Sequence, residues 1–357
     1  MTTSDAMQKT IFVTGGAGYI GTHTLVGLIQ AGYRVLVLDD FSNSSPEALA
    51  RVEAITGSEI SHVRGDIRDT ALLKTIFAGA RDRGTPISCV LHLAALKAVA
   101  ESVSQPLKYY DVNVAGSLSL LEAMQENGLK RLVFSSSATV YRPEGLLPYG
   151  ESHDIGPSNP YGVTKAMVER ILQDFCRAQD GASAIALRYF NPIGAHESGL
   201  LGDFPHGVPN NLFPYITRAA LGSLPVLPIF GTDYDTVDGT GVRDYIHVSD
   251  LADGHVKAID WLVTHQKGGF QALNLGTGKG TSVLQLVRTF EAVNRVKIPY
   301  EVYPRRAGDI AEAWADVSAA QAVLDWRARR SLEDMCRDGW NWQIKNPDGY
   351  VSGRSVS

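Results

Sequence analysis

The chain has 357 residues, of which 44% are apolar and 20% are charged. This length and composition are ordinary for a globular protein with two domains, or with one large domain and a smaller lobe. A core of this size needs neither disulfides nor metal ions to hold it together. The net charge of -5 comes without a long acidic or basic block, which argues against nucleic acid as a partner.

The cysteines and the N-terminus bear on the compartment. The three cysteines are widely spaced, without the spacing of metal ligands, so we expect reduced thiols in the core of a cytoplasmic protein: Cys89, Cys176 and Cys336. The N-terminal residues MTTSDAMQ are polar and form no apolar signal segment. The longest apolar stretch, residues 89–100, is too short to cross a bilayer, and His92 and Lys97 interrupt it. We therefore expect no membrane association.

In the first half of the chain, short apolar runs alternate with helical stretches. Strands are expected at residues 9–14, 33–40, 60–66, 88–93, 131–136 and 183–190, and helices at residues 23–31, 106–127 and 163–179. The strands are apolar throughout rather than alternating, which is typical of a parallel sheet covered on both faces. The sequence therefore predicts an α/β fold with a doubly wound parallel sheet of the Rossmann type.

The second half of the chain differs from the first in composition and in its pattern of apolar residues. Residues 191–245 are rich in Gly, Pro, Asn and Asp, and we expect loops and short strands that build a lid or pocket. Further on, helices are expected at residues 249–263 and 282–294, and strands at residues 272–276 and 300–303. We therefore divide the chain into a nucleotide-binding domain, residues 9–190, and a smaller mixed α/β domain for the substrate, residues 191–350. Some segments of the second are expected to return to the first.

A glycine-rich turn, GGAGYIGT, follows the first expected strand. Gly16, Gly18 and Gly21 fit the pattern G-x-G-x-x-G, and Gly15 with Gly18 and Gly21 fits a related one. Between a strand and a helix, such glycines let the backbone approach a pyrophosphate that rests on the helix N-terminus. The alternative is a tight strand–helix turn that binds no ligand.

Acidic residues end the next two strands. Asp39 and Asp40 can accept hydrogen bonds from the ribose hydroxyls of NAD and would repel the extra phosphate of NADP, and no arginine or lysine follows until Arg51. This favours NAD, although two solvated acids at a strand end are the simpler reading. Asp66 ends the third strand, either within reach of the adenine or as the N-cap of the next helix.

Tyr161 and Lys165 lie one turn apart on an expected helix, just after the serine-rich strand end at residues 135–139. A phenol with a pKa of about 10 is a poor base at neutral pH. A nearby ammonium and the positive nicotinamide ring both favour phenolate, so we expect the pKa of Tyr161 to fall to about 7, which needs roughly 4 kcal/mol. Tyr161 then becomes a general base, with a serine sharing the proton. The alternative is a surface pair at helical spacing.

These motifs together resemble the extended short-chain dehydrogenase/reductases, through TGGAGYIG, SSSATVY and YGVTK. Longer stretches resemble the UDP-glucose 4-epimerase (UDP-galactose 4-epimerase) family within that group, among them LKAVAESVSQPLKYYDVNV, LRYFNPIGAH, GVPNNLFPYI and PRRAGDIAEAWAD. The likeness runs from about residue 10 to about residue 350. It implies NAD-dependent interconversion of UDP-glucose and UDP-galactose through a 4-keto sugar, by a homodimer that takes a UDP-hexose as its substrate.

The resemblance also implies residue roles. Tyr161 takes the proton of the sugar 4-hydroxyl, Ser137 bonds to the reacting oxygen, and Lys165 holds the nicotinamide ribose and tunes Tyr161. The implied cofactor residues are Gly15, Gly18, Tyr19, Ile20, Gly21, Asp39, Asp40, Asn43, Ser44, Asp66, Ile67, Leu93, Ala94, Lys97, Ser137, Tyr161, Lys165 and Tyr189. The implied substrate residues are Lys97, Ser137, Tyr161, Asn191, Asn211, Leu212, Phe230, Arg243, Arg306, Asp309 and Ala313.

Some positions depart from the family pattern or vary within it. Ala95, Ala100 and Arg142 stand where glycine is frequent, which leaves the local loop geometry open. The family varies between tyrosine and small residues at position 313, at the sugar end of the pocket. Ala313 should leave room for a 2-acetamido group, because overpacking costs about 1–3 kcal/mol. We therefore expect UDP-GlcNAc and UDP-GalNAc as possible further substrates.

Three rival functions are weaker. A nucleotide-sugar dehydratase needs an acid and a base where this chain has Ala138 and Thr139. A UDP-glucuronate 4-epimerase is the closest alternative, and the KAVAES and NPIGAH stretches fit the hexose enzyme better. A non-catalytic NAD-binding scaffold would typically lack Tyr161 or Lys165. The resemblance further implies that the helices at residues 106–127 and 163–179 form the dimer interface, with apolar residues that include Val112, Leu118, Leu121, Met124, Val163, Met167, Ile171 and Phe175.

Overall fold

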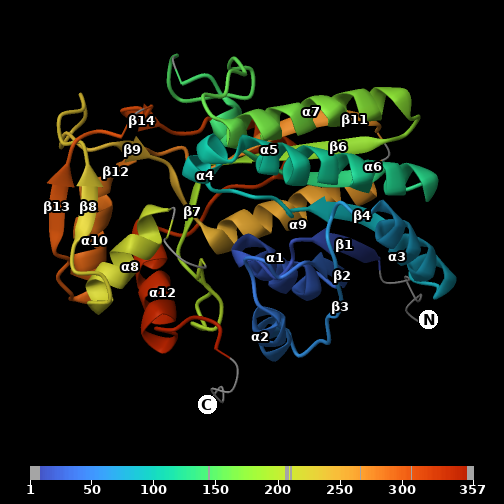
Figure 1. The fold of residues 1–357 in the computed structure, drawn as a ribbon, viewed down its shortest axis with the longest axis horizontal. Coiled ribbons are helices and arrows are strands. Elements are labelled where there is room, and N and C mark those ends of the chain that lie inside the picture. The colour runs from blue at the N-terminus through green and yellow to red at the C-terminus, as the bar shows by residue number, and fades with distance from the viewer. Residues whose placement is uncertain are drawn as a thin grey trace.

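A seven-stranded parallel sheet forms the centre of the larger part of the molecule (Figure 1). The computed structural model describes residues 9–143, 145–205, 209, 211–265, 267–306 and 308–351. The strand order is β11-β6-β5-β4-β1-β2-β3. The bounds are β1 Thr10–Thr14, β2 Arg34–Asp39, β3 Ser61–Arg64, β4 Ile87–His92, β5 Arg131–Ser137, β6 Ser183–Tyr189 and β11 Gly269–Leu275. This is the doubly wound Rossmann order with one strand added, so the expected fold class is confirmed.

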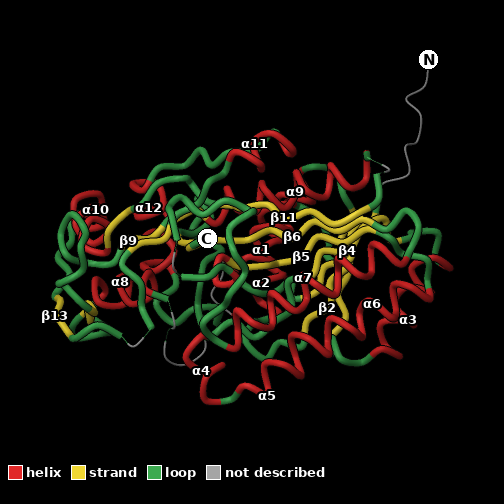
Figure 2. The backbone as a smooth tube through the Cα atoms, turned by 90° about the horizontal axis from the view of Figure 1, so that it is seen from above, coloured by secondary structure: helices red, strands yellow, loops and turns green. Residues whose placement is uncertain are grey.

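Helices cover both faces of this sheet, as Figure 2 shows from above. Successive strand residues point to opposite faces, so Ile11 and Val13 of β1 enter one apolar core and Phe12 enters the other. The first core is completed by α1 (Tyr19–Gln30), α2 (Pro46–Thr56), α9 (Val248–Thr264) and α11 (Ser318–Leu324). The second is completed by α3 (Thr70–Asp82), α6 (Gly116–Glu126) and α7 (Pro160–Ala178).

The helix expected at residues 106–127 is not continuous. It follows α4 (Val99–Ser104) and consists of α5 (Pro106–Tyr109), a π-helical segment at Tyr110–Ala115, and α6. Such π-helical turns are rare and often mark functional sites. Here the segment carries Asn113, a buried residue whose side chain bonds to both backbone groups of Leu96, at 2.8 and 3.0 Å. The irregular turn therefore fixes the loop after β4, which lines the site described below.

The smaller part of the molecule is a mixture of short strands and helices around its own apolar core. Its elements are β7 (Asn191–Ile193), α8 (Leu212–Leu221), β8 (Leu227–Phe230), β9 (Val242–Arg243), β10 (Tyr245–His247), β12 (Thr281–Ser282), α10 (Val283–Asn294), β13 (Tyr300–Tyr303), β14 (Glu312–Ala313) and α12 (Leu332–Lys345). The strands form three small sheets, β10-β7, β12-β9-β14 and β13-β8. Buried Phe213, Phe290 and Met335 join α8, α10 and α12 in this core.

Helix α8 lies in the region where only loops and short strands were expected. Its apolar residues do follow a helical period, but Pro214 falls among them and reads as a helix breaker. In the first turn a proline costs little, because the backbone N–H groups there have no partner within the helix. The proline-containing composition that favoured loops is therefore compatible with a helix here, since Pro214 lies near the helix start.

Three elements from beyond residue 191 lie with the large sheet, one of them α11 in the first apolar core. Helix α9 belongs to the same apolar core as α1, and β11 pairs in parallel with β6 from Gly269 to Leu275. The order of elements in the chain thus passes from the sheet to the smaller part and back. The division into domains at residues 190 and 191 stays a prediction.

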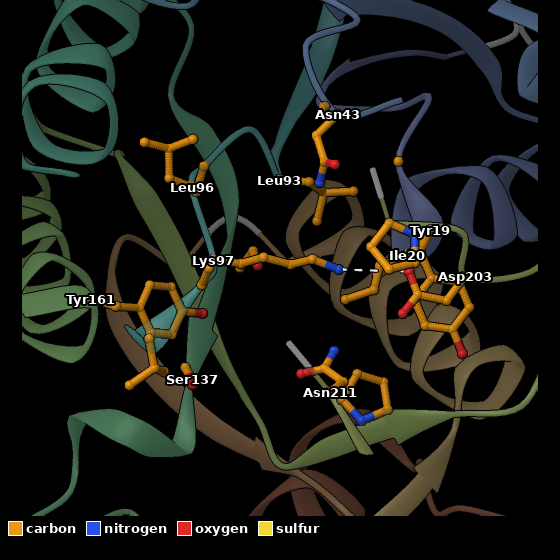
Figure 3. Close-up of a pocket in the computed structure, with 18 of the residues that line it drawn as sticks. Tyr19, Ile20, Asn43, Leu93, Leu96, Lys97, Ser137, Tyr161, Asp203 and Asn211 are labelled. Atoms are coloured by element: carbon orange, nitrogen blue, oxygen red, sulfur yellow. Dashed lines mark ion pairs between the residues drawn. The ribbon is translucent and has the colours of Figure 1, made fainter. Parts of the chain in front are cut away.

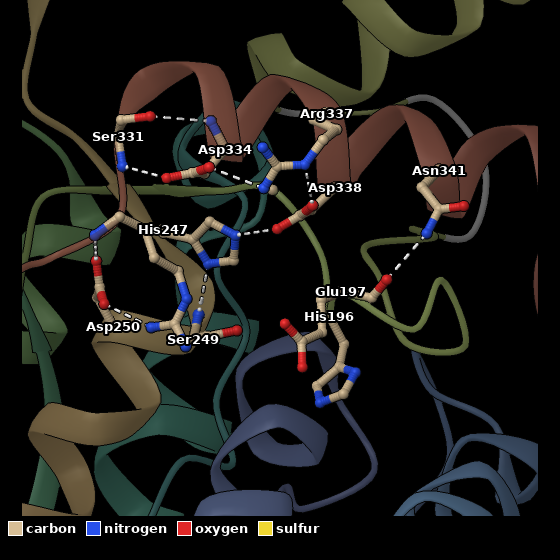
Figure 4. Close-up of polar contacts among 12 residues, drawn as sticks. His196, Glu197, His247, Ser249, Asp250, Ser331, Asp334, Arg337, Asp338 and Asn341 are labelled. Carbon is tan, nitrogen blue, oxygen red and sulfur yellow. Dashed lines mark hydrogen bonds and ion pairs between the residues drawn. The ribbon is translucent and has the colours of Figure 1, made fainter.

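The last helix, α12, is fastened to the rest by a set of polar contacts (Figure 4). A capping box joins Ser331 and Asp334 at its start. The ring of His247, at the end of β10, lies 3.3 Å from a carboxylate oxygen of Asp338. Farther along, the Asn341 amide donates to the Glu197 carbonyl at 3.0 Å. These contacts join α12 to the segments that follow β7 and β10.

The expectations for the cysteines agree with the structure, since Cys89, Cys176 and Cys336 are free and buried. Among the described residues, no group of His, Cys, Asp or Glu side chains is arranged to hold a metal ion. Within the same residues, no helix has the length and apolar character needed to span a bilayer.

Candidate active site

A large cavity lies at the carboxyl ends of the sheet strands and extends to the smaller part of the molecule (Figure 3). It encloses about 1170 Å³, whereas pockets for a single small molecule typically measure roughly 300–1,000 Å³. Its lining includes the glycine turn and the serine-rich end of β5 on one side, and β8 and β9 on the other. This volume suits a dinucleotide together with a second nucleotide.

The structure brings nearly all expected site residues together. All of the implied cofactor residues line the cavity, from Gly15 to Tyr189. The implied substrate residues line it as well, with the exception of Ala313. Ala313 is half-buried in β14 and packs against an apolar cluster that includes Tyr149 and Phe190. Its expected place at the sugar end of the pocket, like the roles of the lining residues, stays a prediction.

The glycine turn has the geometry of a phosphate cradle. Gly15 has a φ of 69°, and a Cβ added to it would lie 2.7 Å from the Ala94 backbone nitrogen. A Cβ on Gly21 would lie 2.5 Å from the Gly15 carbonyl oxygen. Helix α1 then begins at Tyr19 without a side-chain cap, which leaves its first N–H groups available. The turn therefore fits the pyrophosphate of a dinucleotide, because a helix N-terminus attracts an anion.

The acidic strand end is organised by its own loop. Asp39 is buried, and its carboxylate accepts hydrogen bonds from the backbone N–H of Ala17 at 2.9 Å and from the Ser44 hydroxyl at 2.7 Å. The exposed Asp40 accepts from Ser42 at 2.8 Å. Both aspartates line the cavity. A buried carboxylate tied to the glycine turn is well placed to orient the ribose side of NAD.

Asp66 does not cap the following helix. The N-cap of α3 is Asp69, whose side chain accepts from the Leu72 N–H at 2.9 Å. Asp66 instead lines the cavity and pairs with Arg68, with one hydrogen bond at 3.0 Å, and this pairing lowers the pKa of Asp66. Of the two readings given above, the N-cap is wrong, and the contact with adenine stays a prediction.

Tyr161 and Lys165 lie in the first two turns of α7, which begins with a cap. The Asn159 side chain accepts from the Gly162 N–H at 2.9 Å, and Pro160 occupies the first helical position. Lys165 is buried, and its ammonium donates to the Ser135 carbonyl at 2.7 Å. Figure 3 shows the Tyr161 hydroxyl directed into the cavity beside Ser137. The arrangement can take a proton from a hydroxyl held between Ser137 and Tyr161.

The acidity expected of Tyr161 is not produced by the residues of this chain. Burial raises the pKa of Tyr161 to about 12, and a hydrogen bond with Ser137 opposes this only in part. Burial also lowers the pKa of Lys165 to about 7. Desolvation outweighs the lysine charge, since the ammonium lies 5.8 Å from the centre of the Tyr161 ring and bonds elsewhere. The expected fall in the pKa of Tyr161 invoked the nicotinamide ring as well as Lys165, so it stays a prediction for the NAD-bound protein.

The substrate side of the cavity carries paired charges. Arg243 in β9 forms an ion pair with Asp309 at 2.5 Å. The guanidinium of Arg306 lies 3.9 Å from the centre of the Phe230 ring, in a cation–π contact. Asn191, in β7, and Asn211, just before α8, complete the polar lining here. Two guanidinium groups suit a diphosphate, because each can bond to two oxygens.

Sequence reasoning missed several lining residues. Asp203 forms an ion pair with Lys97, with 3.8 Å between the charged atoms, and Figure 3 marks the pair by a dashed line. Phe204, Tyr215 and Tyr350 also line the cavity. They come from loops and ends of elements far apart in the chain and belong to no local motif. Among the departures from the family pattern, Ala95 lines the cavity, whereas Ala100 and Arg142 do not.

Comparison with known proteins gives the family. The sequence model of the NAD dependent epimerase/dehydratase family matches residues 11–276. The UDP-glucose 4-epimerase of Pasteurella multocida is 54% identical over 95% of this chain and 99% of its own length. The corresponding protein of Bacillus subtilis is 51% identical over 96% of this chain and 99% of its own.

Solved structures agree. A crystal structure of UDP-glucose 4-epimerase from Bifidobacterium longum, in complex with NAD+ and UDP, has a TM-score of 0.90 at 48% identity and covers 96% of this chain and 100% of its own. The family description confirms NAD as the cofactor that the acidic strand end predicted. The chain therefore belongs to the NAD dependent epimerase/dehydratase family and, within it, to the UDP-glucose 4-epimerases.

Proposed function

We propose that this chain interconverts UDP-glucose and UDP-galactose by epimerising carbon 4 of the hexose. The observation that carries this proposal is one cavity in which Tyr161, Ser137 and Lys165 share the lining with the glycine turn and with Arg243. Relatives over nearly the full length are named for UDP-glucose, which favours this substrate over UDP-glucuronate.

The chemistry divides between the cofactor and the chain. NAD, when bound, accepts a hydride from carbon 4 and returns it to the opposite face of the sugar. Tyr161 takes the proton of the 4-hydroxyl and later gives it back, and the Ser137 hydroxyl bonds to the reacting oxygen. Lys165 reaches the space beside Tyr161 from the next turn of α7 and holds the ribose. The glycine turn and Asp39 keep the cofactor in register with these groups.

The substrate is held by its nucleotide rather than by its hexose. Arg243 and Arg306 are proposed to bind the diphosphate, with Asp309 accepting from the uridine ribose and Phe230 packing on the nucleotide. The 4-keto sugar must turn its other face to the cofactor before the hydride returns, so its ring cannot be fixed by many hydrogen bonds. Arg243, Arg306 and Asp309 line the substrate side of the cavity together, which supports this division of labour.

Use of UDP-GlcNAc and UDP-GalNAc stays a prediction. Its original reason, a small side chain at position 313 beside the sugar, is weakened because Ala313 is not among the lining residues. If these sugars are epimerised, the room for the 2-acetamido group comes from other residues. Ala313→Tyr should then change the epimerisation of N-acetylated and of plain UDP-hexoses by factors that agree within about threefold. Selective loss of the N-acetyl activity would instead show that position 313 lies beside the 2-acetamido group.

The assembly and compartment are also proposed. Apolar residues are exposed on the helices expected at the dimer interface, including Leu107, Leu118 and Met167, with exposures of 80, 43 and 43%. Leu121 and Met124 are instead buried in the core. We propose a cytoplasmic homodimer that buries the exposed set, and light scattering of the purified protein measures its mass.

The experiment that tests the function uses purified protein and UDP-galactose, without added reductant. We expect UDP-glucose as the product, because the hydride taken from carbon 4 returns to the same carbon. UDP-glucuronate supplied instead should stay unchanged. Conversion of UDP-glucuronate in preference to UDP-galactose would overturn the proposal, and so would net oxidation of the sugar with accumulation of free NADH.

A further inference from the structure

Three consecutive serines at the end of β5 each contact a different residue of α7. The Ser135 carbonyl accepts from Lys165 at 2.7 Å, the Ser136 hydroxyl donates to Glu169 at 2.5 Å, and Ser137 is hydrogen-bonded to Tyr161. Tyr161, Lys165 and Glu169 are spaced four residues apart, so they form one row along the helix. The reacting end of the site therefore continues into the protein as far as Glu169, which none of the motifs above includes.

Glu169 is held in a buried network. Glu169 is 3% exposed, and Arg188 of β6, 4% exposed, bonds to its two carboxylate oxygens at 3.0 and 2.6 Å. Arg188 also donates to the Tyr141 hydroxyl at 3.0 Å and to the Glu151 carbonyl at 3.2 Å. Burying charges is costly, and such a pair persists only with good geometry and further hydrogen bonds, both of which are present here. The carboxylate is thus fixed in position.

The charge of Glu169 affects the protonation of Lys165. Lys165 and Arg188 are buried cations, and the charge of Glu169 is the one that raises the pKa of Lys165 against the effect of burial. The other titratable groups that face this region come from several elements: Tyr161 of α7, His92 of β4, Tyr189 of β6, Tyr141 after β5, Tyr109 of α5, and Glu101 of α4, which bonds to Tyr109. Of the two carboxylates in this region, Glu169 is the one that shares a helix face with Lys165, one turn away.

We propose that Glu169 is a positioning residue for the epimerase reaction, holding the α7 turn of Lys165 and Tyr161 against β5 and providing the counter-charge that keeps Lys165 an ammonium. This inference rests on the proposed function. Arg188 serves it by fixing the carboxylate, and Ser136 joins the carboxylate to the strand that also carries Ser137. Glu169 itself does not touch the sugar or the cofactor, since it does not line the cavity.

The first test compares Glu169→Gln with Asp174→Asn, a matched change at an exposed ion pair on the same helix. For Glu169→Gln we expect kcat to fall about tenfold or more at pH 8, with KM within about threefold and the alkaline limb of the kcat profile moved to lower pH. Asp174→Asn should match the wild type. The proposal would be overturned if Glu169→Gln kept the wild-type pH profile with kcat within threefold of the wild-type value. An equal loss of kcat in Asp174→Asn would overturn it as well.

The second test removes the pair without leaving an unpaired charge. The double variant Glu169→Met with Arg188→Met should fold, because apolar residues of similar volume often replace buried ion pairs at no cost. Thermal unfolding and NAD content of the purified protein check this. We expect the loss in kcat to persist with NAD content unchanged. Activity near that of the wild type would mean that the pair is only structural, and loss of NAD would place its role in cofactor binding; either result overturns the proposal.

A third measurement needs no turnover, so it separates this inference from the proposed function. The ultraviolet titration of Tyr161 in NAD-bound protein is taken as the difference between each protein and its Tyr161→Phe counterpart. In Glu169→Gln, loss of the Lys165 charge should move Tyr161 ionisation to higher pH, because Lys165 lies closer to Tyr161 than Glu169 does. An unchanged titration would overturn the inference even if UDP-galactose is converted. A shifted titration would sustain it even if UDP-galactose is not a substrate.

Discussion

The two sides of the cavity are built in different ways. On the cofactor side, Lys165 and Asp39 are buried and hydrogen-bonded to backbone groups, and the glycine turn leaves no room for side chains. On the substrate side, Arg243 and Asp309 have side chains 20 and 35% exposed, and they pair with each other. A buried, fully bonded site holds one ligand in one place, whereas partly exposed pairs can exchange partners. The difference fits a cofactor that stays bound and a substrate that comes and goes.

The largest effect is expected from a substitution on the cofactor side of the cavity. Gly15→Val should abolish NAD binding and reduce activity by about a thousandfold or more, because its Cβ would lie 2.7 Å from the Ala94 nitrogen. Gly57→Ala is the matched control, since Gly57 has a similar φ of 67° with nothing within 4 Å. It should lose only stability, about 1 kcal/mol. Retention of NAD by Gly15→Val, read from the absorbance of the purified protein, would contradict the proposal that the glycine turn binds the pyrophosphate.

On the substrate side, a smaller and different effect is expected. Arg243→Ala should raise KM for UDP-galactose about 10- to 100-fold and leave NAD content unchanged, because it removes a charged contact of about 1.5–3 kcal/mol. Arg305→Ala is the control, since Arg305 neighbours Arg306 but pairs with exposed Asp233 outside the cavity lining. Steady-state kinetics of both variants separates the two. A loss of kcat with unchanged KM in Arg243→Ala would mean that this residue acts on the chemistry instead.

The buried polar groups of the cofactor side also make stability depend on pH. Burial lowers the pKa of His92 from 6.5 to about 3. The unfolded chain therefore binds a proton below pH 6.5 that the folded protein does not, so stability is present above that pH and is lost as the pH falls towards 3. At pH 5 the loss is about 2 kcal/mol. Denaturant unfolding at pH 7 and 5 should show it, and His92→Gln should reduce it; an identical pH dependence in the variant would contradict this origin.

The smallest effect concerns the pair that spans the two sides. Lys97 and Asp203 lie 3.8 Å apart, and the Lys97 side chain is 43% exposed. Such pairs contribute about 0–1 kcal/mol, so Asp203→Asn should change KM by less than about fivefold. We expect even this difference to fade at about 1 M salt, where screening is strong. A loss of activity that salt does not reduce would show that Asp203 has a role beyond its ion pair with Lys97.

The same contrast explains what the sequence could predict. The strands of the large sheet, the glycine turn, Asp39 and the spacing of Tyr161 and Lys165 are local patterns with a fixed period, and each was found close to its observed bounds. Resemblance supplied Arg243, Arg306 and Asn191, which no local pattern marks. The apolar cluster around Ala313 and the desolvation of Tyr161 were not predicted, since both depend on tertiary surroundings.

Asp203 and Glu169 show why the remaining residues around the site cannot be predicted from the sequence. Asp203 lies in a loop and reaches the cavity only because the smaller part folds back towards the sheet. Glu169 looks like an ordinary helical glutamate until Arg188, 19 residues later, is placed beside it. Charges that meet across elements cannot be paired from one sequence, since helix periodicity fixes the face of a residue but not its partner.

The most direct test of the account is the activity of Tyr161→Phe, which removes one oxygen atom from the group assigned to proton transfer. The wild-type protein and the variant are purified with their bound NAD, supplied with UDP-galactose, and assayed for UDP-glucose. We predict that the variant keeps its NAD and its fold while conversion falls about a hundredfold or more. Conversion by the variant within threefold of the wild type would contradict the claim that this phenol carries the proton.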